Sequence, residues 1–446
     1  MKGLFLIYGI AGVGTLAALY SPAIGLFIYV GFAVLRPEGL WGWAGDLTGI
    51  SLVVGIATLI GWLIRGFGTR QFGPGRLIVL ALMAFFVWSM LSAANAQDKQ
   101  AAYDSIITMA KFVMPFLIGV TLLDSEPQAR RLMWIIVIAQ GYVGFEMNLD
   151  YWRGYNLAGD GFAGMDNNCF GVSLVSTLGP ALALALISRK WWEKVLSLTA
   201  AALILHTTLL TYSRGAMLGL IVVGATAFVL MPKRPKYVLA LAITALITVR
   251  FVGPQLRDRY ATAFAAEEEL DGSSQSRLSL WRDCFKLALN QPAFGVGPAN
   301  FPIVAPTLGW EEGKEAHSVW MQTLAEVGFP GLVLLFVFFG WTVVKVWPLA
   351  RQKLTDESRY RVAIASGIVM SIVGFMVAGQ FVSLAGLETP YYMAMIGVVL
   401  LKQTPKAHEV APATRPAARL TIAMQPRFSM RMGSSIASPL TRGPIS

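Results

Sequence analysis

The chain has 446 residues, of which 55% are hydrophobic and only 14% are charged. A soluble globular domain carries about a quarter charged residues, so this composition excludes that class and indicates a membrane protein. The formal net charge is +11, but the basic residues lie in short loops between apolar runs and in the C-terminal tail. That distribution argues against nucleic acid as a partner and matches the excess of Lys and Arg found in cytoplasmic loops of membrane proteins.

Repeated apolar runs of nearly twenty residues predict transmembrane helices. We expect about 12 or 13 of them, and therefore an all-α, polytopic membrane protein. The runs cover residues 3–19, 22–36, 48–64, 76–94, 105–123, 131–147, 168–187, 193–212, 215–232, 236–252, 329–347, 361–383 and 386–401. The first run lacks a strongly basic start and more apolar sequence follows it at once, so we interpret it as a retained helix rather than a signal peptide.

Four regions follow from this pattern. They are an N-terminal transmembrane bundle at 1–252, a loop with short helices at 253–328, C-terminal transmembrane helices at 329–401, and a tail at 402–446 that is rich in Pro, Ser, Ala and Arg. Such a tail is expected to be disordered. The basic loops at 188–194, 231–236 and 351–361 are predicted to be cytoplasmic, so helix alternation places 253–328, as one structured loop, in the periplasm.

The segment "LTYSRGAMLGL" places Arg214 in a tight turn between two apolar runs. Gly215 and Ala216 would let the second helix start close to a neighbouring helix, and Thr211 and Ser213 supply hydroxyls beside the turn. An inward-facing guanidinium at the outer membrane surface is a good receptor for a phosphate group. The alternative is an arginine that extends to the surface and only anchors the helix end.

The long loop contains "SRLSLWRDCFKLALN", whose apolar spacing predicts a helix over 277–289. Ser274 or Ser276 could cap its first turn. Arg277 and Trp281 lie one turn apart and share a face of this helix, which makes Arg277 a second candidate phosphate-binding residue. The following "QPAFGVGPANF" ends the helix with proline and glycine, and its "GVG" is too short a pattern to indicate a phosphate loop.

A second short helix is predicted over 317–327, separated from the run at 329–347 by "GFPG", where Pro330 suits the first turn of a helix. Of the three histidines, His317 is the one placed outside the membrane, because His206 lies in an apolar run and His408 in the tail. Histidine exchanges a proton near neutral pH, so His317 is a candidate catalytic base. The alternative is a polar residue that only makes structural hydrogen bonds.

Five further side chains are weaker candidates. Lys111 lies inside an apolar run, which indicates function, a paired charge or a side chain reaching the surface. Asp166, before two asparagines, could bind sugar hydroxyls or cap the next helix. Glu388 lies in the last outer turn, where it could pair with an arginine that the sequence does not identify. Arg282 points away from the face of Arg277, and Glu326 lies on the side of its helix opposite His317.

Metal and cofactor sites are not predicted. The two cysteines, Cys169 and Cys284, are far apart, no paired metal-ligand spacing occurs, and the chain has neither a P-loop nor a dinucleotide fingerprint. Whether the cysteines pair is not decided by the sequence.

Together, these motifs resemble the superfamily of O-antigen ligases and O-antigen polymerases, which are bacterial membrane glycosyltransferases. The matching segments are "DNN" at 166–168, "LTYSRGAMLGL" at 210–220, "RLSLWRDCFKLALNQPAFGVGPANF" at 277–301 and "AHSVWMQTLAEVGFPGL" at 316–332. The likeness covers most of the chain and is nearest to the branch of O-glycosylation ligases associated with exosortase and exopolysaccharide systems. Many O-antigen ligases have "HN" where this chain has "HS", at Ser318, which favours that branch over a lipopolysaccharide ligase.

This resemblance implies a many-helix fold with a structured periplasmic loop. It also implies an undecaprenyl-diphosphate-linked glycan as donor, a glycan, lipid or protein as acceptor, and no metal. By the same resemblance, Arg214 and Arg277 hold the diphosphate and His317 acts on the acceptor hydroxyl. We therefore predict a metal-independent, inverting glycosyltransferase of the bacterial inner membrane whose active site faces the periplasm.

The alternatives are a transporter or channel for a small anion such as bicarbonate, and a scaffold in a polysaccharide export complex. A transporter holds its substrate near the membrane midplane, between broken and repeated helices. The sequence has no clear internal repeat, and its candidate polar groups gather at the predicted outer face, which favours the enzyme. Nothing in the sequence points to a scaffold.

Overall fold

The computed structural model describes residues 2–43, 45, 47, 49–231, 239, 272–383 and 386–403. Within this part of the chain all regular structure is helical, apart from an isolated bridge between Phe162 and Met165. The helices are α1 (Lys2–Tyr20), α2 (Pro22–Leu35), α3 (Pro37–Trp41), α4 (Ile50–Ile64), α5 (Arg76–Ser92), α6 (Lys99–Leu122), α7 (Glu126–Trp152), α8 (Asn167–Ile187), α9 (Trp191–Leu210), α10 (Arg214–Leu230), α13 (Gly272–Asn290), α14 (Phe301–Val304), α15 (Val319–Ala350), α16 (Arg359–Ala378) and α17 (Glu388–Lys402). Short 3-10 turns are η1 (Gly73–Gly75), η2 (Ala93–Asn95), η3 (Leu157–Gly159), η5 (Ala305–Leu308) and η6 (Gly379–Phe381).

Among the described residues, 8 helices are long and apolar enough to cross a membrane: α1, α5 to α9, α15 and α16. The helices α2, α4 and α10 are apolar but shorter. These findings confirm the predicted class, an all-α polytopic membrane protein. The predicted run at 236–252, the first part of the long loop at 253–271 and the tail from 404 lie outside the described residues.

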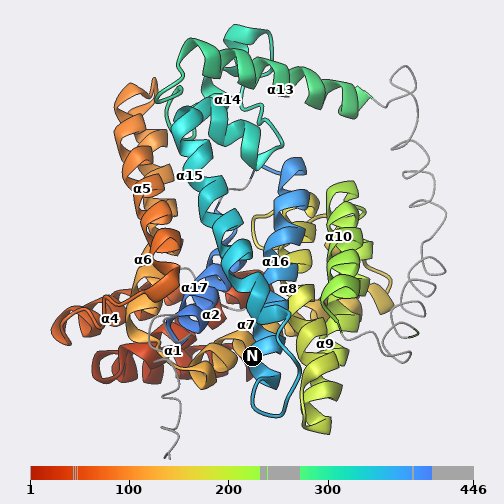
Figure 1. Ribbon diagram of the computed structural model, residues 1–446. Coiled ribbons are helices and arrows are strands. Elements are labelled where there is room, and N and C mark those ends of the chain that lie inside the picture. The colour runs from red at the N-terminus through yellow and green to blue at the C-terminus, as the bar shows by residue number, and fades with distance from the viewer. Residues whose placement is uncertain are drawn as a thin grey trace, which may run out of the picture. The chain divides into compact units, whose positions relative to one another are not determined.

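Helix α8 is the centre of the bundle. It packs against α7, α9, α10 and α16, and nearly all of its side chains are buried. Small residues allow this close packing, because a Cβ added at Gly179 would lie 2.5 Å from the Cβ of Met370 on α16. Figure 1 shows α8 and α16 crossing the same central region, with α10 alongside. The end of α8 that carries Asp166 and Asn167 is therefore held rigidly.

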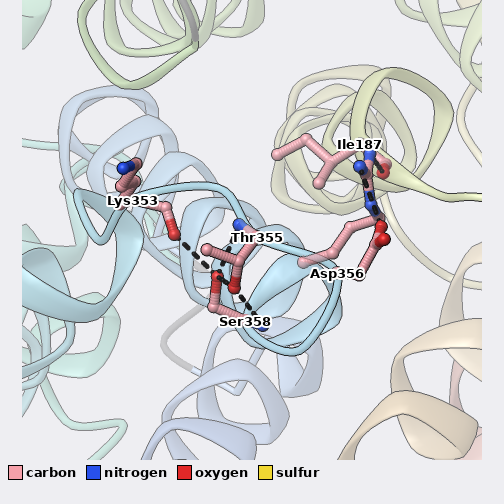
Figure 2. Close-up of polar contacts among 6 residues, drawn as sticks. Ile187, Lys353, Thr355, Asp356 and Ser358 are labelled. Carbon is pink, nitrogen blue, oxygen red and sulfur yellow. Dashed lines mark hydrogen bonds and ion pairs between the residues drawn. The ribbon is translucent and has the colours of Figure 1, made fainter. Parts of the chain in front are cut away.

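The loop between α15 and α16 closes the opposite end of α8. Figure 2 shows the Ser358 hydroxyl donating to the carbonyl of Lys353 (2.7 Å) and accepting from the backbone N–H of Thr355 (3.0 Å). Arg359 donates to the carbonyl of Ile187, the last residue of α8 (3.3 Å), and pairs with Asp356 (3.4 Å). The Arg359 contact satisfies a carbonyl that the end of α8 leaves without a helical partner, and the Ser358 contacts order the loop itself.

Two helix starts differ from the sequence predictions. Helix α13 begins at Gly272 instead of near Arg277, so Ser274 and Ser276 lie inside it and are not its caps. Helix α15 begins at Val319, and the Ser318 hydroxyl caps it by accepting from Met321 N (3.2 Å). His317 consequently lies before the helix, in a left-handed backbone conformation with φ 50°. A residue in that conformation cannot continue a right-handed helix, which is why the predicted start at 317 is wrong.

The predicted break in "GFPG" is confirmed at Gly328, whose φ of 75° and ψ of −178° interrupt α15. The break leaves carbonyls of the preceding turn without helical partners, since Pro330 has no N–H to offer. The segment around "GVG" replaces those partners: Val296 N donates to Ala325 O and Gly297 N to Glu326 O, both at 2.9 Å. This segment thereby joins the loop after α13 to the kink of α15.

Candidate active site

His317 occupies a segment that is hydrogen-bonded on several sides. Its own N–H donates to the Ser383 hydroxyl (2.8 Å), just after η6. The preceding residue, Ala316, accepts from Trp281 Nε1 of α13 (3.0 Å) and donates to Gln322 Oε1 of α15 (3.3 Å). A non-glycine residue in the left-handed region is held there at a cost of about 1–2 kcal/mol, so the surrounding hydrogen bonds define the conformation. The imidazole is therefore presented from an ordered backbone.

The charges around His317 come from three parts of the chain. Burial lowers the pKa of His317, and the positive charge of Arg277 on α13 lowers it further. Glu315 and Asp166 act in the opposite direction, and Lys314 adds a smaller lowering effect. A histidine with a lowered pKa is neutral at physiological pH and can accept a proton. Arg277 and Asp166, which are remote in sequence, are thus electrostatic neighbours of His317.

Arg214 is the first residue of α10 and is half-buried. The turn before it is short: α9 ends at Leu210, and the Ser213 hydroxyl caps α10 by accepting from Ala216 N (3.3 Å). The hydroxyls of Thr211 and Ser213 both make hydrogen bonds within this turn. They therefore order the backbone that carries Arg214, in addition to any contact with a ligand.

One segment, Phe381–Ser383, connects the elements that carry the three main candidates. A Cβ added at Gly215, next to Arg214, would lie 2.6 Å from the Cβ of Phe381. The Phe381 ring lies 6.4 Å from the ring of Trp281, one turn from Arg277 on α13. Ser383 binds the backbone of His317. The start of α10, one face of α13 and the segment before α15 therefore meet at the same place.

The start of α8 joins this group. Asn167 Nδ2 donates to the carbonyl of Thr211 in the α9–α10 turn (2.9 Å). The Asp166 carboxylate accepts from Cys169 N (2.7 Å). It therefore caps α8, which was one of its two predicted roles. Asp166 is also exposed and near enough to His317 to affect its pKa. Capping and proximity to the site therefore occur together at this residue.

Three of the weaker candidates lie apart from these contacts. Arg282 is exposed on another face of α13, as predicted. The side chain of Lys111 is exposed on α6, while its carbonyl accepts from the Tyr29 hydroxyl (2.7 Å). Glu388 pairs with Arg36 (3.2 Å), which identifies the arginine that the sequence left open. Arg36 also donates to the carbonyl of Ala163 (3.1 Å), so this pair ties α2 and α17 to the loop before α8.

Glu326 is buried, and neighbouring groups hold its carboxylate by hydrogen bonds. Its carboxylate accepts from the backbone N–H groups of Ala299 (3.0 Å) and Phe301 (3.3 Å) and from Gln322 Nε2 (3.1 Å). Gln322 in turn accepts from Ala316 N, next to His317. The prediction that Glu326 lies opposite His317 on one helix does not apply, because His317 precedes α15, and the sequence gave no sign of this indirect connection.

Cys284 lies on the buried side of α13, packed with Leu280, Phe301 and Ala325. Burial raises the pKa of its thiol to about 12, with the charges of Glu326 and Asp283 adding to the effect. The thiol is therefore protonated and unreactive at physiological pH. Cys169 and Cys284 do not form a disulfide with each other.

A family model described as O-antigen ligase matches residues 199–336. The chain is similar to the O-antigen ligase family over this range. The matched range includes Arg214, Arg277 and His317, which lie on the three elements that meet near Phe381–Ser383. No curated protein matches the chain. The match supports the O-antigen ligase superfamily and a glycosyl-transferring, multi-pass membrane protein, while the exosortase-associated branch stays a prediction.

Sequence reasoning did not find the residues that support this candidate site. Ser383, Gln322 and Phe381 have no distinctive sequence pattern, because their roles depend on contacts with residues of other segments. Trp281 was recognised only as sharing a face with Arg277. Its hydrogen bond to Ala316 depends on the tertiary position of α13, which apolar periodicity alone does not define.

Proposed function

We propose that the protein transfers a glycan from an undecaprenyl-diphosphate carrier to an acceptor hydroxyl at the periplasmic face of the bacterial inner membrane. The observation that supports this most is the meeting of the Arg214 turn, the Arg277 face of α13 and the His317 segment around Phe381–Ser383. An O-antigen ligase domain covers the same three residues.

The two arginines suit a diphosphate leaving group. Arg214 begins α10, where the free N–H groups and the helix dipole already favour an anion. Its guanidinium and that of Arg277 would hold the diphosphate and neutralise the charge that grows on it as the bond to the sugar breaks. Because fixed guanidinium groups supply this charge, we propose that transfer needs no metal ion and is insensitive to a chelator.

His317 suits the acceptor side. Its neutral imidazole would accept the proton of the acceptor hydroxyl while that oxygen bonds to the anomeric carbon. The bond between that carbon and the diphosphate oxygen breaks in the same step, and the diphosphate leaves with the electron pair. One direct displacement of this kind inverts the anomeric configuration. The acceptor is a hydroxyl of a glycan, a lipid or a protein.

The test is a transfer assay in membranes, with a radiolabelled undecaprenyl-diphosphate glycan and the variants Arg214→Gln, Arg277→Gln and His317→Gln. Each variant is expected to lose at least about 100-fold in kcat/KM, typical of removing a catalytic base or a donor to a developing anion. Arg282→Gln is the matched control, because Arg282 is exposed on another face of α13. Undiminished transfer in Arg214→Gln and His317→Gln would overturn the mechanism, and solute uptake by vesicles without glycan would favour the transporter.

A further inference from the structure

Arg277 and His317 lie on separate elements, and no shared helix fixes their relative positions. Arg277 lies on α13, and His317 lies just before α15. Transfer chemistry needs leaving group and base in defined relative positions, because an error of about 1 Å can cost 100-fold in rate. Some contact must therefore fix α13 against the His317 segment.

Trp281 makes that contact. It lies one helical turn after Arg277 on the same face of α13. Its indole N–H donates to the carbonyl of Ala316 (3.0 Å), the residue directly before His317. Its ring packs against Phe381, with centroids 6.4 Å apart, in the segment that also holds His317 through Ser383. Trp281 thus contacts both the residue before His317 and the segment whose Ser383 binds the backbone of His317.

The remaining packing of α13 does not involve His317 in the same direct way. Leu280 and Cys284, on the buried side of α13, pack in one cluster with Phe301, Ala325 and Ala316, and Trp281 lies against the same cluster. A second tryptophan hydrogen bond, from Trp310 Nε1 to Asp283 (3.0 Å), ties the same helix to the loop after η5. Apolar packing therefore brings α13 against Ala316, and Trp281 adds a directional hydrogen bond at that residue.

We propose that Trp281 is a positioning residue for glycan transfer: by binding Ala316 and packing on Phe381, it holds the Arg277 guanidinium beside His317. The proposal rests on the proposed function for its catalytic consequence. The geometric part, the alignment of Arg277 with His317, can be measured without any transfer reaction.

The first experiment measures the titration of His317 by NMR in the full-length protein, with carbon-13-labelled histidine. The chain has only 3 histidines, so His317→Gln identifies the signal. Trp281→Phe keeps an aromatic ring and removes the N–H. If Arg277 moves away, its pKa-lowering effect weakens, and the His317 titration shifts to higher pH. Lys314, Glu315 and Asp166 also act on His317, so a double-mutant cycle is needed to isolate the effect of Arg277.

The control is Trp310→Phe, which removes an equivalent indole N–H from the other contact of α13. It is expected to leave the His317 titration unchanged. A double-mutant cycle isolates the cause: Arg277→Gln should raise the pKa of His317 in the wild-type background and raise it clearly less in the Trp281→Phe background. An equal effect of Arg277→Gln in both backgrounds would overturn the proposal, whatever the stability of the variants.

The second experiment measures transfer from the undecaprenyl-diphosphate glycan. Trp281→Phe is expected to lower kcat about 10-fold with little change in KM, and to move the acid limb of the kcat profile to higher pH, because alignment is lost while binding groups remain. A lower kcat with an unmoved acid limb would assign Trp281 to packing alone. If the wild-type protein transfers no glycan, the proposed function fails, and the NMR cycle still decides whether Trp281 aligns Arg277 with His317.

Discussion

At the scale of single residues, the charges around His317 predict how activity depends on pH. Burial and Arg277 lower the pKa of His317, while Glu315 and Asp166 raise it. A general base works in its neutral form, so transfer should persist below the usual histidine value of about 6.5 and fall only as the pH drops through the lowered pKa. Removing a negative neighbour must lower this pKa further.

Asp166→Asn tests that sign, because asparagine caps a helix as well as aspartate does but carries no charge. We expect the acid limb of the kcat/KM profile to move to lower pH, with protein levels and melting temperature close to wild type. Glu311→Gln, at an exposed position in the loop that carries His317, serves as the control. An acid limb that moves to higher pH would contradict the electrostatic arrangement around His317.

Glu326 makes a separate prediction about stability. Glu326→Ala leaves the N–H groups of Ala299 and Phe301 without their acceptor in a buried site. Each such group costs about 1–3 kcal/mol, so the melting temperature of the detergent-solubilised protein should fall by several degrees. Glu315→Ala, at an exposed carboxylate before His317, should melt like wild type. Equal melting of the two variants would show that the carboxylate does not hold this loop.

Residue roles were predictable only where the partner is local. The capping function of Asp166 follows from its position before the apolar run of α8, and the structure confirms it. The partner of Glu388, Arg36, lies hundreds of residues earlier, and no feature of either segment points to the other. Ser383 and His317 are 66 residues apart, and neither segment points to the other. Long-range hydrogen bonds are set by how helices pack, which a single sequence does not specify.

At the scale of elements, the break in α15 shows what proline and glycine reveal. Pro330 and Gly328 correctly predicted an interruption, because proline removes a helical donor and glycine accepts a positive φ. The role of "GVG" was missed, since its purpose is to bring backbone donors to Ala325 and Glu326 at the break. Glycine is required there for close approach: a Cβ on Gly295 would lie 2.4 Å from Ala325 O.

Gly328→Ala should therefore be costly. Its φ is 75°, and an added Cβ would lie 2.5 Å from the carbonyl of Ala293. Such strain costs about 1–3 kcal/mol and should loosen the loop after α13, seen as faster hydrogen exchange over 291–301. Gly340→Ala is the matched control in the same helix, where a Cβ would meet nothing within 4 Å. Gly340→Ala should match or exceed wild-type stability; unchanged exchange in Gly328→Ala would count against this role for the break.

At the scale of the whole molecule, the class and most helix positions were predictable from apolar runs alone. The runs at 168–187 and 193–212 correspond to α8 (Asn167–Ile187) and α9 (Trp191–Leu210). Which helix becomes central was not predictable, because α8 and α5 are both strongly apolar, and only α8 is buried along nearly its whole length. In a membrane, lipid and protein are equally apolar surroundings, so hydrophobicity does not distinguish them, and small residues such as Gly179 decide the packing.

The sidedness of the molecule is the last expectation, and it decides whether the proposed site can use a periplasmic donor. His317 and the start of α8 share one end of the bundle, while the α15–α16 loop is bound to the opposite end of α8. Single cysteines at the exposed positions Glu312 and Glu357, in a Cys169→Ser background, report on the two ends. Cys284 is buried and unreactive, so it adds no background.

A membrane-impermeant maleimide should label Glu312→Cys in spheroplasts with an intact inner membrane and Glu357→Cys only after permeabilisation. The reverse pattern would place the arginines and His317 in the cytoplasm, and the proposed use of a periplasmic lipid-linked glycan would fail with it.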